Sequence, residues 1–271
     1  MQDTNNNAVT LTYPRAGVAQ LTLNRPDKRN AFHAGIIRTL TEHLEAVADD
    51  GQVRVLVLAA AGKHFCAGAD LGWMRDTAAM SEADNRDDAR ALARLMTTLD
   101  TLAKPTIARV QGAAFGGALG LICCCDMAIA ADDALFCLSE VRLGLAPATI
   151  GPFVVRAMGH RQARRYLLSA ERFGAQDAQR LGVVHESVPL ARLDERVEEQ
   201  INALLDAGPE ALGACKHLLL DLENAAASDQ IHEQTAELIA RLRTGAEGQE
   251  GLTAFFEKRE PQWRIRPEES S

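Results

Sequence analysis

Aromatic side chains are scarce in this chain and make up only 4% of its 271 residues. The core must therefore be built mainly from alanine, leucine, valine and isoleucine, which suits an α/β fold with close helix contacts. No apolar run approaches the roughly 20 residues that a membrane-spanning helix needs. Residues 1–7 are polar and lack the basic and apolar regions of a signal peptide. We expect a soluble, cytoplasmic protein with no membrane contact.

Basic residues are also in deficit, with 29 lysines and arginines against 37 acidic residues and a net charge of −8. A nucleic-acid-binding protein needs a basic face, so this balance argues against nucleic acid as a partner. A few local cations would still suffice to hold one phosphate group. The composition therefore leaves an anionic small molecule open as a ligand.

Cysteine patterns typical of metal sites or redox motifs are missing. The six cysteines are Cys66, Cys123, Cys124, Cys125, Cys137 and Cys215. No C-x-x-C pair occurs, and three consecutive side chains diverge too much to close on one metal ion. We interpret the cysteines as small buried hydrophobic residues kept reduced, and we expect neither disulfides nor zinc.

The first 190 residues alternate short β-branched runs with longer helical stretches. Strands are predicted over residues 8–13, 18–24, 53–60, 106–110, 126–130 and 135–138. Residues 34–48 and 83–102 have the apolar spacing of helices. The first two strands are joined by the turn at 14–17, and the later strand–helix–strand order predicts parallel pairing with crossover connections.

From about residue 190 the strand signals end. Helical stretches follow at 190–205, 210–223, 229–243 and 250–258. We therefore predict two units: an α/β core over residues 1–190 that contains the functional site, and a helical domain over residues 191–271. The second unit would serve as a lid or as an oligomerisation surface.

Two segments rich in small residues follow predicted strands. Residues 63–71 read K-H-F-C-A-G-A-D-L, and residues 110–121 read V-Q-G-A-A-F-G-G-A-L-G-L, with a helix predicted to begin near Gly117. Small side chains at the carboxyl end of a parallel strand let a ligand approach the backbone, and a helix N-terminus stabilises negative charge. Neither segment has the dinucleotide or P-loop signature, and each alone is also compatible with a plain turn.

Glu140 is a candidate carboxylate for proton transfer. It follows an apolar strand and precedes a loop rich in glycine and proline, in S-E-V-R-L-G-L-A-P over residues 139–147. Partial burial would raise its pKa and suit it to shuttle a proton. The alternatives are a helix N-terminal glutamate that satisfies backbone groups, or an ion pair with Arg142.

Taken together, the order and spacing of these segments resemble the crotonase (enoyl-CoA hydratase/isomerase) superfamily over nearly the whole chain. Further matches are V-A-Q-L-T-L-N-R-P-D-K-R-N-A-F at 18–32, E-R-F-G-A-Q-D-A-Q-R-L-G-V-V at 171–184 and E-G-L-T-A-F-F-E-K-R at 250–259. The resemblance implies a spiral of β-β-α units followed by a helical domain, assembled as trimers or as hexamers made of two trimers. It implies an acyl-CoA thioester as substrate and no separate cofactor.

The resemblance also implies roles for individual residues. The backbone N–H groups of Ala69 and Gly117 would form an oxyanion hole for the thioester carbonyl, where fixed donors stabilise the developing charge. The residues implied in coenzyme A binding are Ala67, Gly68, Asp70 and Leu71 through their backbone, Lys28 and Arg29 at the phosphates, and Lys258 from the closing helix, reaching a neighbouring subunit's ligand. A solvated surface position explains any one of these lysines equally well.

The catalytic carboxylates depart from the family pattern. Typical hydratases carry two glutamates, and this chain has Gly120 at the first position and Glu140 at the second. One glutamate could activate the water and return its proton to the α-carbon, so we predict hydration of an enoyl-CoA. The alternatives are a Δ3,Δ2-enoyl-CoA isomerase, and a non-catalytic member that binds acyl-CoA or RNA. The retained loops and the acidic charge argue against the non-catalytic member.

Among family members, the chain looks most like bacterial methylglutaconyl-CoA and isohexenylglutaconyl-CoA hydratases. The segment A-D-L-G-W-M-R at 69–75 and the two loops around Gly117 and Glu140 carry this likeness. It implies a branched acyl group with a distal carboxylate, which Arg75 or Arg142 could pair with. A surface salt bridge is the alternative role for each arginine.

Overall fold

A six-stranded sheet forms the centre of the computed structural model, which describes residues 7–223 and 229–265. The strand order is β1-β2-β3-β4-β6-β9. The bounds are β1 Val9–Arg15, β2 Val18–Leu23, β3 Val55–Ala60, β4 Thr106–Val110, β6 Met127–Ala131 and β9 Glu186–Val188. β1 and β2 form an antiparallel hairpin, and every later neighbour in this sheet is parallel, which confirms the predicted pairing.

A second sheet of three strands lies beside the carboxyl ends of the first. It has the order β5-β7-β8, with β5 Ala113–Phe115, β7 Leu135–Cys137 and β8 Phe173–Gly174. β5 follows β4 and β7 follows β6, so the chain supplies a strand to each sheet in turn and then a helix. This is the β-β-α spiral of the crotonase fold. The sequence did not predict β5, because A-A-F is too short and small to give a strand pattern.

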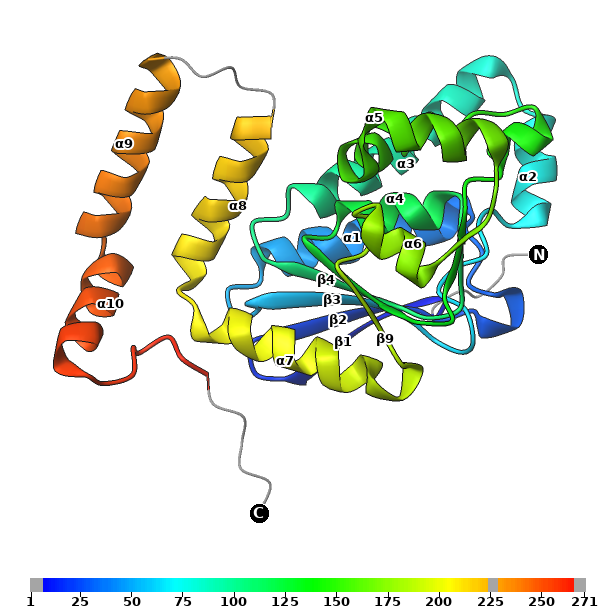
Figure 1. Ribbon diagram of the computed structural model, residues 1–271. Helices are drawn as coiled ribbons and strands as arrows, with labels where there is room; N and C mark the ends of the chain where they lie inside the picture. The colour runs from blue at the N-terminus through cyan, green and yellow to red at the C-terminus, as the bar shows by residue number, and fades with distance from the viewer. Residues whose placement is uncertain (1–6, 224–228, 266–271) are drawn as a thin grey trace.

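Helices cover both faces of the large sheet (Figure 1). Helices α1 (Ala34–Asp49), α3 (Glu82–Asp100), α4 (Gly117–Cys124), α5 (Gly151–Ser169) and α6 (Ala175–Arg180) lie above it, and α7 (Leu193–Asp206) lies below. Strand β3 is buried on both sides, as predicted: Leu56 and Leu58 face the upper core, whereas Val55 and Val57 face α7. The upper core is the larger of the two.

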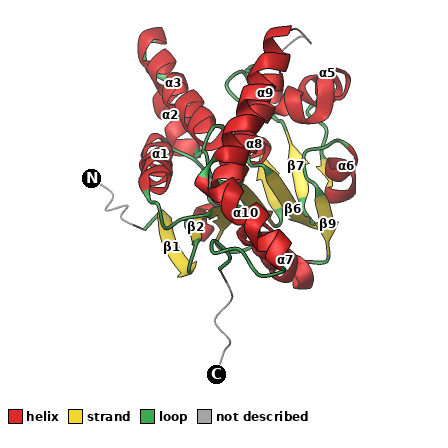
Figure 2. Cartoon of the chain, turned by 90° about the vertical axis from the view of Figure 1, so that its left-hand side faces the viewer, coloured by secondary structure: helices red, strands yellow, loops and turns green. Residues whose placement is uncertain are grey.

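Helix α7 corrects the predicted division at residue 190. Its buried stripe of Leu193, Val197, Ile201, Leu204 and Leu205 packs on the sheet and belongs to the core. The helices that leave the body are α8 (Pro209–Glu223), α9 (Asp229–Thr244) and α10 (Ala246–Glu257) (Figures 1 and 2). We call these three helices the arm. The structural break therefore follows α7.

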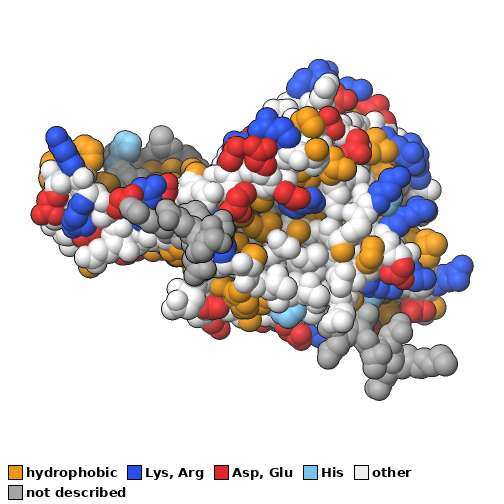
Figure 3. All heavy atoms as spheres, turned by 90° about the horizontal axis from the view of Figure 1, so that it is seen from below, with side chains coloured by type: hydrophobic (Ala, Val, Ile, Leu, Met, Phe, Trp, Pro, Cys, Tyr) orange, Lys and Arg blue, Asp and Glu red, His pale blue; other side chains and the backbone are white. Residues whose placement is uncertain are grey.

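The arm exposes large apolar side chains (Figure 3). They are Leu219 and Leu222 on α8, Ile239 on α9, and Leu252, Phe255 and Phe256 on α10. The two phenylalanines are 77% and 75% exposed. Midway along α8, an ion pair between Lys216 Nζ and Asp126 Oδ2 at 2.9 Å ties the helix to the body. The arm thus has an apolar surface that the body of this chain does not cover.

The cysteines differ in part from their expected burial. Cys66, Cys124, Cys125 and Cys137 are buried, whereas Cys123 is half-buried and Cys215 on α8 is exposed. Among the described helices, none combines the length and the apolar character that crossing a membrane would require.

Candidate active site

The two small-residue loops lie side by side. The segment after β3 pairs with neighbouring backbone through isolated bridges, Phe32 with Ala69 and Cys66 with Ala114. Cys66 N–H donates to the Ala113 carbonyl at 3.0 Å, and Phe115 N–H donates to the Cys66 carbonyl at 2.9 Å. The first loop is therefore held in an extended form beside β5, directly before α4 begins.

Two backbone N–H groups remain available where these loops meet. Within the described part of the chain, neither Ala69 N–H nor Gly117 N–H donates to a protein acceptor. Adjacent groups are occupied: Asp70 N–H donates to the Phe32 carbonyl at 2.7 Å, and Gly116 N–H donates to the Cys137 carbonyl at 2.9 Å. Gly117 opens α4, where unpaired N–H groups and the helix dipole favour negative charge. The two groups can receive a developing oxyanion.

Glycine is required at two turns of this site. Gly116 has φ 55° and ψ −124°, and a Cβ there would lie 3.1 Å from Glu140 Oε1. Gly68 has φ 100°, and a Cβ there would lie 3.4 Å from the Phe115 carbonyl oxygen. Left-handed backbone is costly for residues with a side chain, so these positions explain the glycines of both motifs. The same turn brings the Glu140 carboxylate against the start of α4.

Glu140 begins the 3-10 helix η2 (Glu140–Leu143), which follows β7. Its side chain is half-buried, and its Oε2 atom is buried without a hydrogen-bond partner among the described residues. Burial raises the pKa of this carboxyl, and its own backbone N–H lowers it by a smaller amount. A half-desolvated carboxylate with an unpaired oxygen is suited to take up a proton. Arg142 is not its ion-pair partner, because that guanidinium donates to the Ala170 carbonyl at 2.8 Å.

Gly120 was expected among the catalytic positions, and the structure corrects this. It is fully buried in α4 and does not line the cavity. A Cβ at this position would lie 2.4 Å from Ile150 Cγ2 and 3.1 Å from Met96 Cε. Ile150 thus occupies the space that a side chain at 120 would enter, so among the described residues the reacting end of the cavity has one carboxylate, Glu140.

A cavity of about 440 Å³ contains these groups. Of the predicted residues, Ala67, Gly68, Ala69, Leu71, Gly117 and Glu140 line it. Its far wall comes from α2 (Leu71–Ala78) and α3, through Trp73, Met74, Thr77, Asn85, Asp88 and Leu92. No lysine, arginine or histidine is among the described residues that line it, whereas Glu140 and Asp88 are.

Asp70 lies beside the cavity but has a structural role. Its carboxylate caps α2 by accepting from the N–H groups of Gly72 at 2.8 Å and Trp73 at 3.4 Å. Burial raises the pKa of this carboxyl, but the two N–H groups and nearby Arg25 outweigh that effect and leave it lowered. The side chain is therefore committed to the helix start.

The predicted phosphate-binding cations lie outside the cavity. Lys28 and Arg29 are exposed on the loop after β2. Lys63, which the sequence did not indicate as a binding residue, and Arg29 both act on His64, whose pKa is lowered first by burial and then by these two cations. Lys258 follows α10 on the arm, on the side of the molecule opposite α2 (Figure 1). Within one chain, Lys258 is thus remote from the site.

Asn30 is a further residue whose role the sequence did not reveal. It is buried, and its backbone is left-handed, with φ 56°. Its amide donates to the carbonyls of Ala61 and His64, both at 2.9 Å, and its oxygen accepts from Arg25 N–H at 2.8 Å. It joins the loop after β2 to the loop after β3. Its place in the L-N-R-P-D-K-R-N-A-F motif was the available signal.

Neither arginine expected at a distal carboxylate lines the cavity. Arg75 is exposed in the last turn of α2, and Arg142 is bonded to Ala170. The described residues of this chain therefore offer such a carboxylate no cation.

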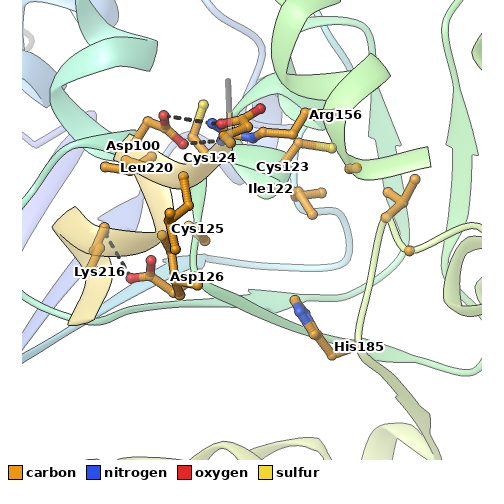
Figure 4. Close-up of a pocket in the computed structure, with 16 residues that line it drawn as sticks. Asp100, Ile122, Cys123, Cys124, Cys125, Asp126, Arg156, His185, Lys216 and Leu220 are labelled. Carbon is orange, nitrogen blue, oxygen red and sulfur yellow. Dashed lines mark hydrogen bonds and ion pairs between the residues drawn. The ribbon is translucent and has the colours of Figure 1, made fainter. Parts of the chain in front are cut away.

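A second cavity of about 470 Å³ lies between α4, α5 and α8 (Figure 4). Its charged groups are paired with each other: Arg156 with Asp100 and Glu223, and Lys216 with Asp126. Because these charges already have partners, we assign this cavity to the junction of the arm and the body.

Comparison with known proteins agrees with this geometry. The family model described as enoyl-CoA hydratase/isomerase matches residues 14–266. A crystal structure of an enoyl-CoA hydratase from Shewanella pealeana superposes with a TM-score of 0.93 at 51% identity, covering 96% of this chain and 97% of that one. The hydroxycinnamoyl-CoA hydratase-lyase of Pseudomonas fluorescens is 41% identical over 74% of both chains. The 2,3-dehydroadipyl-CoA hydratase of Escherichia coli is 33% identical over 92% of this chain and 96% of its own length. The chain therefore belongs to the enoyl-CoA hydratase/isomerase family as an enzyme of the hydro-lyase type.

Proposed function

We propose that the protein adds water to an α,β-unsaturated acyl-CoA with Glu140 as its single acid–base residue. The observation that carries this proposal is the meeting of three groups in one cavity. The free N–H groups of Ala69 and Gly117 lie where two loops join, and the Glu140 carboxylate lies against the turn that begins α4.

The reaction follows from these positions. Glu140 takes a proton from water, and the oxygen of that water bonds to the β-carbon of the enoyl thioester. The electrons of the double bond move onto the thioester oxygen, which the N–H groups of Ala69 and Gly117 stabilise. Removing one such donor typically costs about 3–4 kcal/mol of transition-state stabilisation. Protonated Glu140 then returns its proton to the α-carbon, which completes the addition.

One observation favours a second candidate, a Δ3,Δ2-enoyl-CoA isomerase. Ile150 fills the space beside Gly120, so a single carboxylate serves the reacting end. Moving one proton between two carbons needs only that carboxylate and the same oxyanion stabilisation. Mass spectrometry separates the two reactions, because only the hydrated product gains the mass of one water.

The test is Glu140→Gln, followed by loss of the conjugated-thioester absorbance with crotonyl-CoA. We expect kcat to fall by about 10²–10⁴, the usual contribution of a positioned acid–base group. Glu82→Gln is the matched control, because Glu82 is 89% exposed at the start of α3 and pairs only with Arg86 there. Full activity of Glu140→Gln would remove Glu140 from the mechanism.

Two lines of argument about the acyl group of the substrate lead to different conclusions. The likeness to methylglutaconyl-CoA hydratases supports a branched acyl group with a distal carboxylate, and one relative is named for 2,3-dehydroadipyl-CoA. The cavity lining, with two carboxylates and no cation among the described residues, supports an acyl group without that charge. Parallel assays with crotonyl-CoA and 3-methylglutaconyl-CoA decide between them, since faster turnover of the second would favour the carboxylated acyl group.

We further propose that the arm is the oligomer contact of a trimer or of a hexamer made of two trimers. The support is its exposed apolar surface, which includes Phe255 and Phe256 and which the body leaves uncovered. Lys258, remote from its own cavity, would then approach the coenzyme A of a neighbouring subunit, while Lys28, Arg29 and Lys63 serve their own. Lys258→Ala should raise KM for the CoA ester with little effect on kcat.

A further inference from the structure

A carboxylate that serves neither the oxyanion nor Glu140 lines the cavity. Asp88 lies on α3, on the same face as Asn85 and Leu92, and all three border the cavity. Asp88 is half-buried, whereas the neighbouring acidic residues Asp84 and Asp87 are exposed. An acidic side chain on the inner face of an otherwise solvated helix requires a reason other than solubility.

Asp88 lies toward the acyl end of the cavity. Met96, on the same helix, touches the position of Gly120 beneath the reacting end. Asp88 precedes Met96 by two turns, which is about 12 Å along a helix axis. Asp88 therefore lies about two turns from the part of α3 beneath Gly120, in a wall that also contains the apolar side chains of Trp73, Met74 and Leu92, and an apolar wall suits an acyl chain.

Trp73 on α2 is the neighbour that orients Asp88. Its indole N–H is buried and has no hydrogen-bond partner among the described residues. Burial raises the pKa of the Asp88 carboxyl. The Trp73 indole lowers the same pKa by a smaller amount, so the two side chains interact. The indole and the carboxylate therefore lie close together in the cavity wall, and the indole N–H is available to orient Asp88.

Apart from the Trp73 indole, the nearby polar donors of Asn85 and Thr77 are already used within the α2–α3 turn. The Asn85 amide donates to the Thr77 carbonyl at 2.8 Å, and the Thr77 hydroxyl donates to the Trp73 carbonyl at 3.0 Å. With no cation among the described residues of the lining, a ligand group at this end meets an acceptor carboxylate. A hydroxyl can donate to that acceptor, whereas a second carboxylate is repelled by it.

We propose that Asp88 is a specificity residue that accepts a hydrogen bond from a hydroxyl on the distal end of the acyl group and disfavours a carboxylate there. Trp73 is its positioning residue. This inference rests on the proposed acyl-CoA hydratase function and names the chemistry of the acyl end that the site selects.

The experiment uses three CoA esters of equal chain length, in a six-carbon and an eight-carbon series. Each is a 2-enoyl-CoA that ends in a methyl, a hydroxyl or a carboxylate. The measured quantity is the ratio of kcat/KM for the hydroxyl ester to that for the carboxylate ester, so a general loss of activity cancels. Calorimetric Kd values for the same esters give the ratio independently of turnover.

In the wild type we expect the hydroxyl ester to be preferred by at least about tenfold, a difference of the size that like-charge repulsion produces. Asp88→Asn should bring the two esters within about threefold of each other, mainly by improving the carboxylate ester. Asp87→Asn is the matched control: it removes the same charge from the adjacent residue, whose carboxylate is exposed and pairs with Arg90, and its ratio should equal that of the wild type. Trp73→Phe should lower the ratio in part.

A wild type that prefers the carboxylate ester, or an Asp88→Asn ratio equal to the wild-type ratio, would overturn the role of Asp88. Turnover of the methyl ester separates this failure from failure of the hydratase proposal. If none of the esters is hydrated but the Kd ratio behaves as described, the specificity residue stands and the proposed reaction does not.

Discussion

Replacing Gly120 by alanine should destabilise the protein by about 2 kcal/mol, although alanine is the better helix former. The new Cβ would lie 2.4 Å from Ile150 Cγ2 and 2.9 Å from Ile150 Cβ, with Met96 Cε at 3.1 Å. Ile150 and Met96 are both buried, and Ile150 Cβ can move only with its backbone. The contact therefore cannot be relieved by turning one flexible side chain.

The magnitude follows from two opposing effects. Overpacking a filled core costs about 1–3 kcal/mol, and this contact belongs at the upper end because it reaches an atom next to the backbone. Alanine in place of glycine inside a helix returns up to about 1 kcal/mol. The net loss of about 2 kcal/mol corresponds to a melting temperature lowered by roughly 4–8 °C for a domain of this size.

Thermal and urea unfolding at one fixed protein concentration measure this loss. Gly151→Ala is the control, because a Cβ at Gly151 meets nothing within 4 Å. Ile150→Ala removes the Cγ2 contact, so Gly120→Ala should cost less in that background, with a coupling energy of about 1 kcal/mol. A Gly120→Ala protein as stable as the wild type would refute the reasoning, and the space beside Gly120 would then be open to a second glutamate.

Four further predictions concern the site and the arm. Burial raises the pKa of Glu140, and the reaction needs its ionised form. The value of kcat/KM should therefore fall as the pH is lowered through a pKa above that of an ordinary glutamate. Glu140→Gln should lack this acid limb. The folded state favours the proton on Glu140, so wild-type stability should decrease as pH rises through the same pKa, and Glu140→Gln should lose this decrease. Lys216→Met leaves Asp126 without its cation and should reduce the stability of the α8 contact by about 1–2 kcal/mol. Proteolysis or hydrogen exchange in α8 should become faster. Unchanged exchange there would contradict the role of this ion pair. Phe255→Ser with Phe256→Ser should reduce the assembly measured by sedimentation, and an unchanged mass would exclude this surface as the contact.

Much of the core could be predicted because its elements are recorded in local patterns. The predicted strand over 106–110 matches β4, and the predicted helix over 34–48 matches α1 to within one residue. The apolar run before Ala60 indicated a strand buried on both faces, and β3 has cores on both sides. The small-residue loops were found for the same reason, since a strand end followed by glycine and alanine is visible in the chain itself.

Other features depend on contacts between distant segments. Helix α7 and the arm helices have similar amphipathic sequences, and only packing on the sheet assigns α7 to the core. Asp88 reads as one more charge on an acidic helix until the turn after α2 directs it into the cavity. Gly120 reads as a missing catalytic residue until Ile150 is found in its place.

The sequence by itself determined most of the large sheet's strands, the main helices and the family, and it indicated Glu140 as the candidate acid–base residue, because hydrophobic period, glycine placement and motif order are local properties. Only the tertiary structure decided that Ala69 and Gly117 present N–H groups without a protein acceptor beside Glu140, and that Ile150 fills the place of a second glutamate. It also decided that the Asp88 carboxylate lines the cavity while no cation is among the described lining residues. These depend on which side chains meet across the core, and packing between segments far apart in the chain leaves no periodic trace in the sequence.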